Sequence, residues 1–396
     1  MVFSGIRPVF IQYRQTLFFP CRQKLALFTS HRALRRELAC GLLLALWCGG
    51  LSNARAQNTE SFSEIVSQAA AARDAGDIPL AIGLYTRTVQ LKPDWKEGWW
   101  NLGVLQYNSG QYAGGIDAFT HLLQLIPTAP PAMALRGLCE FETGAYDDSL
   151  RDLEMSVAHG AANDPRNEQN IRFHLAQLLA HAGKFQGALD QYQILATRQL
   201  TAPDMMIGIS LAGMWVRSFS TGIPEDDREL YQATGSAAYS FLGGNSQKAD
   251  DLFAEIFASH PTTPHLHFLY GFLLFPHDSS LAADQLRKEL IVNPNDENAN
   301  SMLALALVLG GQFKDALEPA KRAYTFAPKL EITQLALGRA LAETGDRESG
   351  EELLRKVIER DPGSLEAHLG LASIYSQNGN REEANHERKI CHELAK

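Results

Sequence analysis

The sequence has no uninterrupted apolar run of 18 residues or more, which excludes an ordinary membrane-spanning helix. Cysteine is scarce as well, with five in 396 residues, and only Cys139 and Cys391 lie beyond residue 56. Two cysteines in a segment of this length do not make a disulfide framework. We therefore expect both to be small, buried apolar residues.

Motifs that carry catalysis are also missing. The sequence contains no His-Glu-x-x-His zinc motif, no phosphate loop ending in Gly-Lys-Ser/Thr and no Gly-x-Ser-x-Gly nucleophile turn. Cys-x-x-Cys and Ser-x-x-Lys pairs are absent too. We therefore expect a protein that is not an enzyme and that holds no cofactor.

Charge divides the chain into two parts. Residues 1–56 hold eight Lys or Arg and a single acidic residue, Glu37, which gives them a net charge of +7. Because the whole chain carries −9, the remaining residues carry −16. This acidic balance and the lack of a basic stripe disfavour nucleic acid as a partner.

The basic part has the features of a secretory signal peptide. A short apolar run, Leu38–Trp47, is followed by the small-x-small site Ala54–Ala56. Cleavage after Ala56 would leave no integral membrane segment and would place the mature protein in the periplasm or outside the cell. An Arg-rich, nearly acid-free leader is also typical of mitochondrial import, so matrix localisation is the competing interpretation.

Histidines supply the strongest metal candidate, the group His265, His267 and His277. Two residues apart on a helix, the first two would point about 200° from each other and could not share one ion without local unwinding. We interpret these histidines as polar residues near a helix start, and expect no metal site.

Glycine and proline recur with one period. Glycines lie 34 residues apart in two series, Gly76, Gly110, Gly144 and Gly311, Gly345, Gly379. Prolines follow at spacings of 33 or 34 within each of two runs, Pro93, Pro127 and Pro261, Pro294, Pro328, Pro362. Glycine ends a helix without a Cβ penalty, and proline cannot continue one. Both series therefore indicate repeated pairs of short helices.

The residues between Lys96 and Pro127 show the motif most clearly. Trp99-x2-Leu102-Gly103, then Phe119 and Pro127, resemble the tetratricopeptide repeat. Gln106 and Gly115 depart from the family's preferred Tyr and Ala. The resemblance implies an all-α fold without strands, a right-handed α-solenoid of about nine helix pairs.

The repeats suggest three segments after the leader. Residues 57–200 form an N-terminal array, and residues 230–396 a C-terminal array that ends in a polar capping helix. Between them, 201–229 break the period; here we expect one irregular apolar helix over Thr201–Phe219, followed by a loop. The pairs are expected to begin near residues 62, 96, 130, 169, 230, 263, 297, 331 and 365.

The leading functional hypothesis rests on the resemblance alone. Tetratricopeptide arrays bind extended peptides or helices in a concave groove, and the matching positions here are Trp100, Tyr107, Asn108, Phe141, Phe173, His181 and Arg339. The leading hypothesis is thus a protein-interaction scaffold; packing against the next repeat is the alternative role of these aromatics. A second hypothesis is a small-ligand carrier or accessory subunit with an apolar pocket around Met205, Met206, Met214 and Trp215. The sequence identifies neither the partner nor the oligomeric state.

Overall fold

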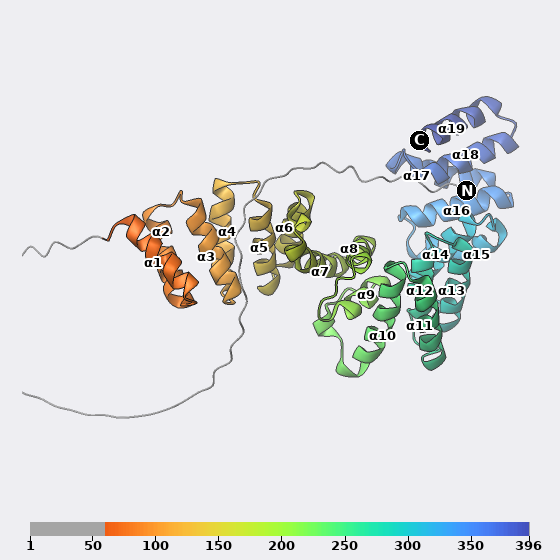
Figure 1. Ribbon diagram of the computed structural model, residues 1–396. Helices are drawn as coiled ribbons and strands as arrows, with labels where there is room; N and C mark the ends of the chain where they lie inside the picture. Colours follow the sequence, from red (N-terminus) through yellow and green to blue (C-terminus); the bar gives the residue numbers. More distant parts are fainter. Residues whose placement is uncertain (1–59, 396) are drawn as a thin grey trace, which may run out of the picture. The chain divides into compact units, whose positions relative to one another are not determined.

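The computed structural model describes residues 60–395, which are almost entirely helical (Figure 1). This range contains 19 α-helices, two short 3-10 helices and no strand, which confirms the all-α prediction. The proposed leader and its cleavage site lie outside the described residues. Within residues 60–395, no helix is both long enough and apolar enough to cross a membrane.

Nine helix pairs and one additional helix make up the described chain. The first four pairs are α1 (Phe62–Asp74) with α2 (Ile78–Leu91), α3 (Lys96–Asn108) with α4 (Tyr112–Leu125), α5 (Pro130–Glu142) with α6 (Tyr146–Ala158), and α7 (Pro165–His181) with α8 (Phe185–Thr197). The additional helix is α9 (Met205–Gly213). Five further pairs follow, α10 (Glu225–Leu242) with α11 (Ser246–Ser259), α12 (Leu266–Leu274) with α13 (Ser279–Val292), α14 (Glu297–Leu309) with α15 (Phe313–Phe326), α16 (Glu331–Thr344) with α17 (Arg347–Arg360), and α18 (Leu365–Gln377) with α19 (Arg381–Leu394).

The periodic glycines end the first helix of their pairs, as predicted. Backbone φ is positive at all six, from +71° at Gly311 to +116° at Gly345, so each adopts the left-handed conformation that favours glycine. The irregular pairs use the same device at Gly183 and Gly244. A left-handed glycine therefore follows the first helix in eight of the nine described pairs, and the pair of α12 and α13 turns without one.

A small residue and a large residue four positions later hold the pairs together. On α2, Ala81 and Tyr85 are both almost fully buried, and the same combination recurs on other second helices as Ala188 with Tyr192, Ala249 with Phe253, and Ala282 with Leu286. The small residue lets neighbouring helices approach, and the large one fills the groove beside it. Gly103 belongs to the same contact, because a Cβ there would lie 2.8 Å from the Phe119 ring.

Gly115, where the family prefers Ala, has a local explanation. A Cβ at this position would lie 2.8 Å from Sγ of Cys139, which projects from α5 of the next pair. The thiol thus occupies the volume that the alanine methyl group would fill. Cys139 is fully buried and unbridged, as expected of a small apolar residue.

The irregular central helix exists but is shorter than predicted. It covers Met205–Gly213 rather than Thr201–Phe219. It ends because Trp215 takes a left-handed backbone, with φ of +58°, which turns the chain out of the helix. Its residues are buried almost without exception, so α9 is a core element. The following helix α10 begins at Glu225, directly after Pro224, and its first turn is acidic.

Glycines allow α9 to pack this closely. A Cβ at Gly235 of α10 would overlap the backbone of Met206, and one at Gly208 would overlap the hydroxyl of Tyr192 on α8. At the other end of α9, a Cβ at Gly213 would lie 2.7 Å from Leu269 of α12. The additional helix therefore inserts between the fourth pair and the pairs that follow, which explains the break in the period.

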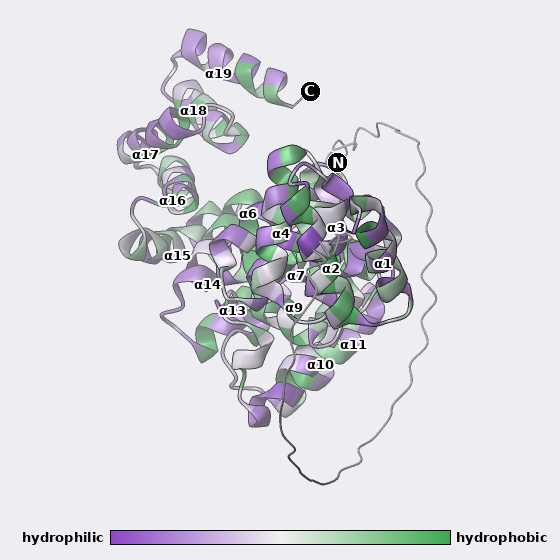
Figure 2. Ribbon diagram, turned by 90° about the vertical axis from the view of Figure 1, so that its left-hand side faces the viewer, coloured by the Kyte–Doolittle hydropathy of each residue, from purple (hydrophilic) through white to green (hydrophobic). Residues whose placement is uncertain are grey.

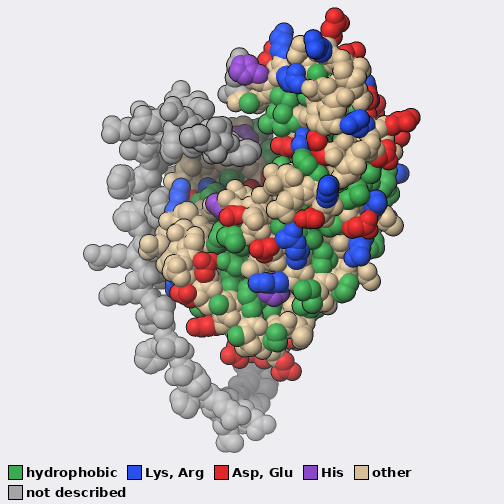
Figure 3. Space-filling view, turned by 90° about the vertical axis from the view of Figure 1, so that its right-hand side faces the viewer, with side chains coloured by type: hydrophobic (Ala, Val, Ile, Leu, Met, Phe, Trp, Pro, Cys, Tyr) green, Lys and Arg blue, Asp and Glu red, His purple; other side chains and the backbone are tan. Residues whose placement is uncertain are grey.

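The last helix is polar, as expected of a terminal cap. On α19 only Ala384 and Cys391 are buried, and Figure 2 shows α17 and α19 with mostly hydrophilic residues. On the face displayed in Figure 3, acidic, basic and apolar side chains are interspersed. The described residues 60–395 belong to one compact unit.

Candidate protein-interaction surface

Aromatic and histidine side chains of the first helices meet on one surface in the N-terminal half. We call this set the aromatic strip and define it as Tyr107 of α3, Phe141 of α5, His174 and His181 of α7, and Phe219 from the loop after α9. The helices α3, α5 and α7 pack in that order. Every member is at least partly exposed to solvent. The strip therefore lies at the edge of the core, where Tyr107, Phe141 and Phe219 pack against buried residues and remain partly exposed.

Phe219 lies at the centre of the ring contacts. Its ring stacks on His181 with centroids 4.5 Å apart and meets Phe141 edge-on at 5.5 Å. Tyr146 of α6 adds a tilted contact at 4.7 Å. Phe219, a loop residue more than 70 positions away in sequence from Phe141, thus packs between rings of the helices α5, α6 and α7. The rings of Phe141, Tyr146 and His181 therefore contact an aromatic side chain of the same protein.

Hydrogen bonds connect Tyr107 to the rest of the strip. The amide of Asn170 on α7 donates to the Tyr107 hydroxyl at 3.4 Å. The carbonyl of Asn170 accepts from Nδ1 of His174 at 2.8 Å, and the His174 ring meets Phe141 edge-on at 4.7 Å. Burial lowers the pKa of His174, so the ring is neutral at neutral pH and the bonded Nδ1 carries its hydrogen.

The other predicted residues do not join this strip. Asn108 is exposed at the end of α3, whereas Phe173 is buried and packs in the core, which is the alternative role considered above. Trp100 is half-buried and meets Phe119 edge-on at 6.0 Å. Arg339 lies on α16, where its guanidinium donates to the Glu366 carbonyl at 3.2 Å. The strip therefore unites only Tyr107, Phe141 and His181 of the seven.

Trp99 packs within its own pair, as its motif position implies. Its ring stacks on His121 of α4 at 4.3 Å, and its indole N–H donates to the Pro93 carbonyl at 2.8 Å. The side chain is half-buried rather than fully buried.

Sequence reasoning missed His174, Asn170 and Phe219. His174 and Asn170 were missed because α7 begins at Pro165, whereas the sequence placed the start of this pair near residue 169. Asn170, His174 and His181 are four and seven residues apart, a helical spacing that was available in the sequence. No sequence signal pointed to Phe219, because only the fold brings its loop to α5 and α7.

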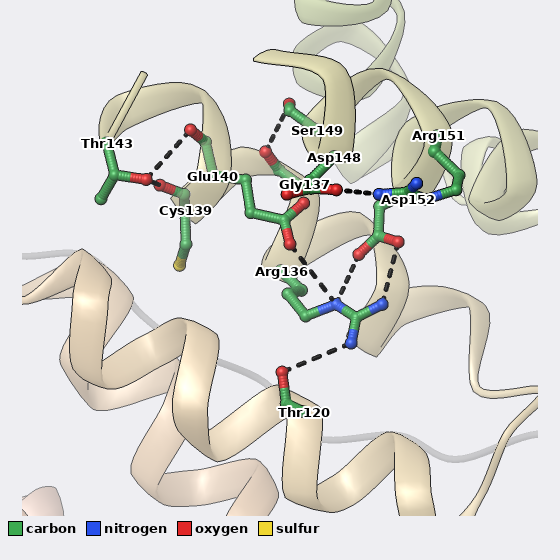
Figure 4. A network of polar contacts seen from close by, with 10 residues as sticks. All are labelled: Thr120, Arg136, Gly137, Cys139, Glu140, Thr143, Asp148, Ser149, Arg151 and Asp152. Atoms are coloured by element: carbon green, nitrogen blue, oxygen red, sulfur yellow. Dashed lines mark hydrogen bonds and ion pairs between the residues drawn. The ribbon is translucent and has the colours of Figure 1, made fainter. Parts of the chain in front are cut away.

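A buried polar network fixes α5, the helix that carries Phe141 (Figure 4). The guanidinium of Arg136 donates to Asp152 of α6 through two bonds, of 2.5 and 2.9 Å. It also donates to the Thr120 hydroxyl of α4 at 3.3 Å. Three helices from two successive pairs are therefore joined at one side chain.

Glu140 is the poorly satisfied member of this network. Its Oε1 lies 3.8 Å from Nε of Arg136, which is already engaged by Asp152, and its buried Oε2 has no hydrogen-bond partner. Burial raises the pKa of Glu140 to about 7, and the neighbouring Asp152 charge adds to the effect.

A second polar cluster surrounds His265, and its carboxylates cap the N-termini of α12 and α14. Its Nδ1 lies 3.0 Å from Oδ2 of Asp296, and Glu289 is the third member. Glu289 accepts from the backbone N–H groups of His265 and Phe268 at the start of α12, and Asp296 from that of Ala299 on α14. The three groups lie close enough to hold a metal ion, but both carboxylates already act as caps.

The other two histidines of the expected group lie apart from this cluster. His267 stacks on Phe257 at 4.0 Å, and His277 meets Phe241 edge-on at 5.5 Å. The three histidines therefore have three separate surroundings, and the structure does not bring them together.

The four residues named for an apolar pocket around α9 pack in or against the core clusters of the described chain. Met205 and Met214 are buried in the core. Trp215 is enclosed by Phe185, Phe268 and Phe272, with ring centroids 5.2–5.5 Å away. None of the four residues named for this pocket lines the cavity that the structure shows between α8 and the turns of later pairs.

Comparison with known protein families and curated proteins finds matches to tetratricopeptide repeats and to one relative. Two models of the tetratricopeptide repeat family match residues 66–130 and 341–386. Cellulose synthase operon protein C of Pseudomonas fluorescens (strain SBW25) is 30% identical over 146 residues, which are 34% of this chain and only 11% of that protein.

Solved structures with similar helix pairs include MamA, with 18% identity, a TM-score of 0.34, and coverage of 40% of this chain and 93% of that chain. A tetratricopeptide repeat protein from Parabacteroides merdae ATCC 43184 has 14% identity, a TM-score of 0.33, and coverage of 71% and 98%.

The family matches fall on regular parts of the array, at α1–α4 and α16–α19. Between them the same geometry continues, with left-handed glycines after the first helices and buried small residues on the second. The chain is a tetratricopeptide repeat protein.

Proposed function

We propose that this protein is a non-catalytic scaffold that binds an extended peptide or a helix of a partner protein along the aromatic strip. The carrying observation is the contact site of Phe219, where partly exposed rings of α5, α6 and α7 already hold an aromatic side chain. Tetratricopeptide repeats support the general role of a protein-interaction scaffold. The aromatic strip is the surface that we propose for this role.

The free part of the strip lies on the α3 side. Phe219 occupies the surface over Phe141 and His181, so a partner would extend from there across Tyr107 to the exposed Asn108. Partly exposed aromatic side chains are favoured at binding hot spots, because they bury a large area at a small entropy cost. The partner segment should therefore present an apolar or aromatic residue to Tyr107, with a polar group near Asn108.

Peptide selection tests this proposal. Random peptides displayed on phage are selected against the full chain, and affinities of the best binders are measured by fluorescence anisotropy. Tyr107→Ala should weaken binding by roughly thirtyfold, which corresponds to a loss of about 2 kcal/mol at a hot spot. Met155→Ala, which truncates an exposed apolar residue on the second helix α6, is the matched control. Peptides that bind the Tyr107 variant as tightly as the wild type would refute the assignment of this surface.

We also propose that the scaffold works outside the cytoplasm. The support is the basic leader with its apolar run and the small-x-small site that ends at Ala56. N-terminal sequencing of exported protein should give Gln57 as the first residue. Exported material that retains residues 7–36 would contradict the cleavage, and recovery from the mitochondrial matrix would favour the competing localisation.

A further inference from the structure

A cavity of about 740 Å³ opens where α9 interrupts the regular stacking. One wall is α8, and the other walls are the end of α10, the start of α11, and α12 with the turn that follows it. Because α8 packs on α9 and α10, it is held away from the α12–α13 pair. The cavity is therefore a consequence of the inserted helix, and its volume lies in the range of ligand-binding pockets.

Three carboxylates line this cavity, one on α8, one on α11 and one in the turn before α13, and no lysine or arginine lines it. Asp190 of α8 accepts a bond from the Gln186 amide at 2.8 Å, and Asp250 of α11 accepts from the Tyr270 hydroxyl. Asp278 accepts from two backbone N–H groups at the start of α13. All of these donors are neutral, and none of the ion pairs among the described residues includes Asp190, Asp250 or Asp278.

Aromatic side chains line the same cavity. Phe241, Tyr270 and Phe272 contribute rings, and His277 packs edge-on against Phe241. Carboxylates beside aromatic rings form the environment that binds organic cations, because the ring faces and the carboxylate oxygens both attract positive charge. A guanidinium group suits such a site best, since it is planar, offers five donors and stacks on rings.

We propose that this cavity is a second binding site, separate from the aromatic strip, for an arginine side chain presented by a segment of a partner protein. Charge complementarity decides the class of ligand: a cavity with three carboxylates and no cation repels acidic groups and accepts a basic one. A cavity of about 740 Å³ exceeds one side chain and leaves room for the residues next to the arginine.

Methyl NMR of the full chain tests the site directly, because five leucines line it, Leu274 and the four reporters Leu189, Leu242, Leu273 and Leu281. The probe is acetyl-Gly-Gly-Arg-Gly-Gly-amide, and the same peptide with citrulline, a neutral isostere of arginine, is the control ligand. We expect the arginine peptide to shift the methyl resonances of these four leucines in a saturable manner. The citrulline peptide should leave them unchanged.

Single substitutions then test which carboxylates bind the arginine side chain. Asp250→Asn and Asp190→Asn should each raise the titration midpoint of the arginine peptide by about tenfold, the effect of one charge-assisted hydrogen bond. Asp251→Asn removes the same charge from the next residue of α11, which does not line the cavity, and should leave the midpoint unchanged. An unperturbed methyl spectrum in each variant shows that the fold is intact.

The proposal fails if the citrulline peptide binds equally well, if the shifts fall on leucines elsewhere, or if neither cavity variant changes the midpoint. Free methylguanidinium that binds as tightly as the peptide would overturn the assignment to a chain segment. None of these outcomes depends on Tyr107, so this test and the test of the aromatic strip fail independently.

Discussion

Replacing Glu140 with glutamine should change how the stability of this protein depends on pH. The carboxyl is buried in the network of Figure 4, where Asp152 takes the guanidinium of Arg136 and leaves Oε2 without a partner. The charged form is therefore disfavoured in the folded state, and the pKa of Glu140 rises from 4.5 to about 7. Glutamine has the same shape but cannot ionise.

The sign and size follow from linkage. A carboxyl whose folded pKa is raised binds its proton more tightly in the folded state, so its contribution is fully present below pH 4.5 and is lost as pH rises through 7. Between pH 5 and pH 8 this group should cost the wild type about 2.5 kcal/mol of unfolding free energy. The Glu140→Gln variant should not show that loss.

Urea unfolding at pH 5 and pH 8 measures the difference, and hydrogen exchange of α5 and α6 amides locates it. A pH-independent effect of the amide group cancels when the two pH values are compared. Glu142→Gln, an exposed change on the same helix, is the control and should leave the wild-type pH dependence intact. If Glu140→Gln and wild type change in parallel between the two pH values, within about 0.5 kcal/mol, the argument is refuted.

Three further predictions concern single side chains. Trp99→Ala should destabilise the N-terminal repeats by about 2–3 kcal/mol, which is below the full cost for a buried tryptophan because the ring is half-buried, and Trp100→Ala should destabilise them less. Thermal unfolding followed by circular dichroism should show the Trp99 change as an early unfolding step. A larger destabilisation by Trp100→Ala would mean that Trp100, and not Trp99, is the packing residue. Cys139 should resist maleimide labelling in the folded protein, since burial raises the pKa of its thiol to about 12, and rapid modification before unfolding would contradict its burial. Phe219→Ala should free the rings around it and increase peptide binding at the aromatic strip in the anisotropy assay; reduced binding would mean that its loop orders the surface.

The sequence by itself determined the repeating unit. Glycines such as Gly110 and prolines such as Pro127 act through their own backbone restrictions, so their spacing reveals where helices end without knowledge of any neighbour. The same logic predicted the starts of six of the nine pairs to the residue. It also predicted an irregular apolar element near Met205, because a fully apolar helix with no polar face breaks the pattern of the array.

Only the tertiary structure decided the surfaces. The family's groove positions assigned Phe173 to the concave face, but in the structure Phe173 is buried in the core and the neighbouring His174 is partly exposed. Phe219 reached the aromatic strip, and Asp190 came to share a cavity with Asp250, through contacts between segments far apart in the chain. Such contacts depend on how α9 displaces its neighbours. The position of α9 is set by close packing at Gly235, which faces the backbone of Met206, and at Gly213, which faces Leu269. A local sequence pattern does not show which helix will pack against a given glycine.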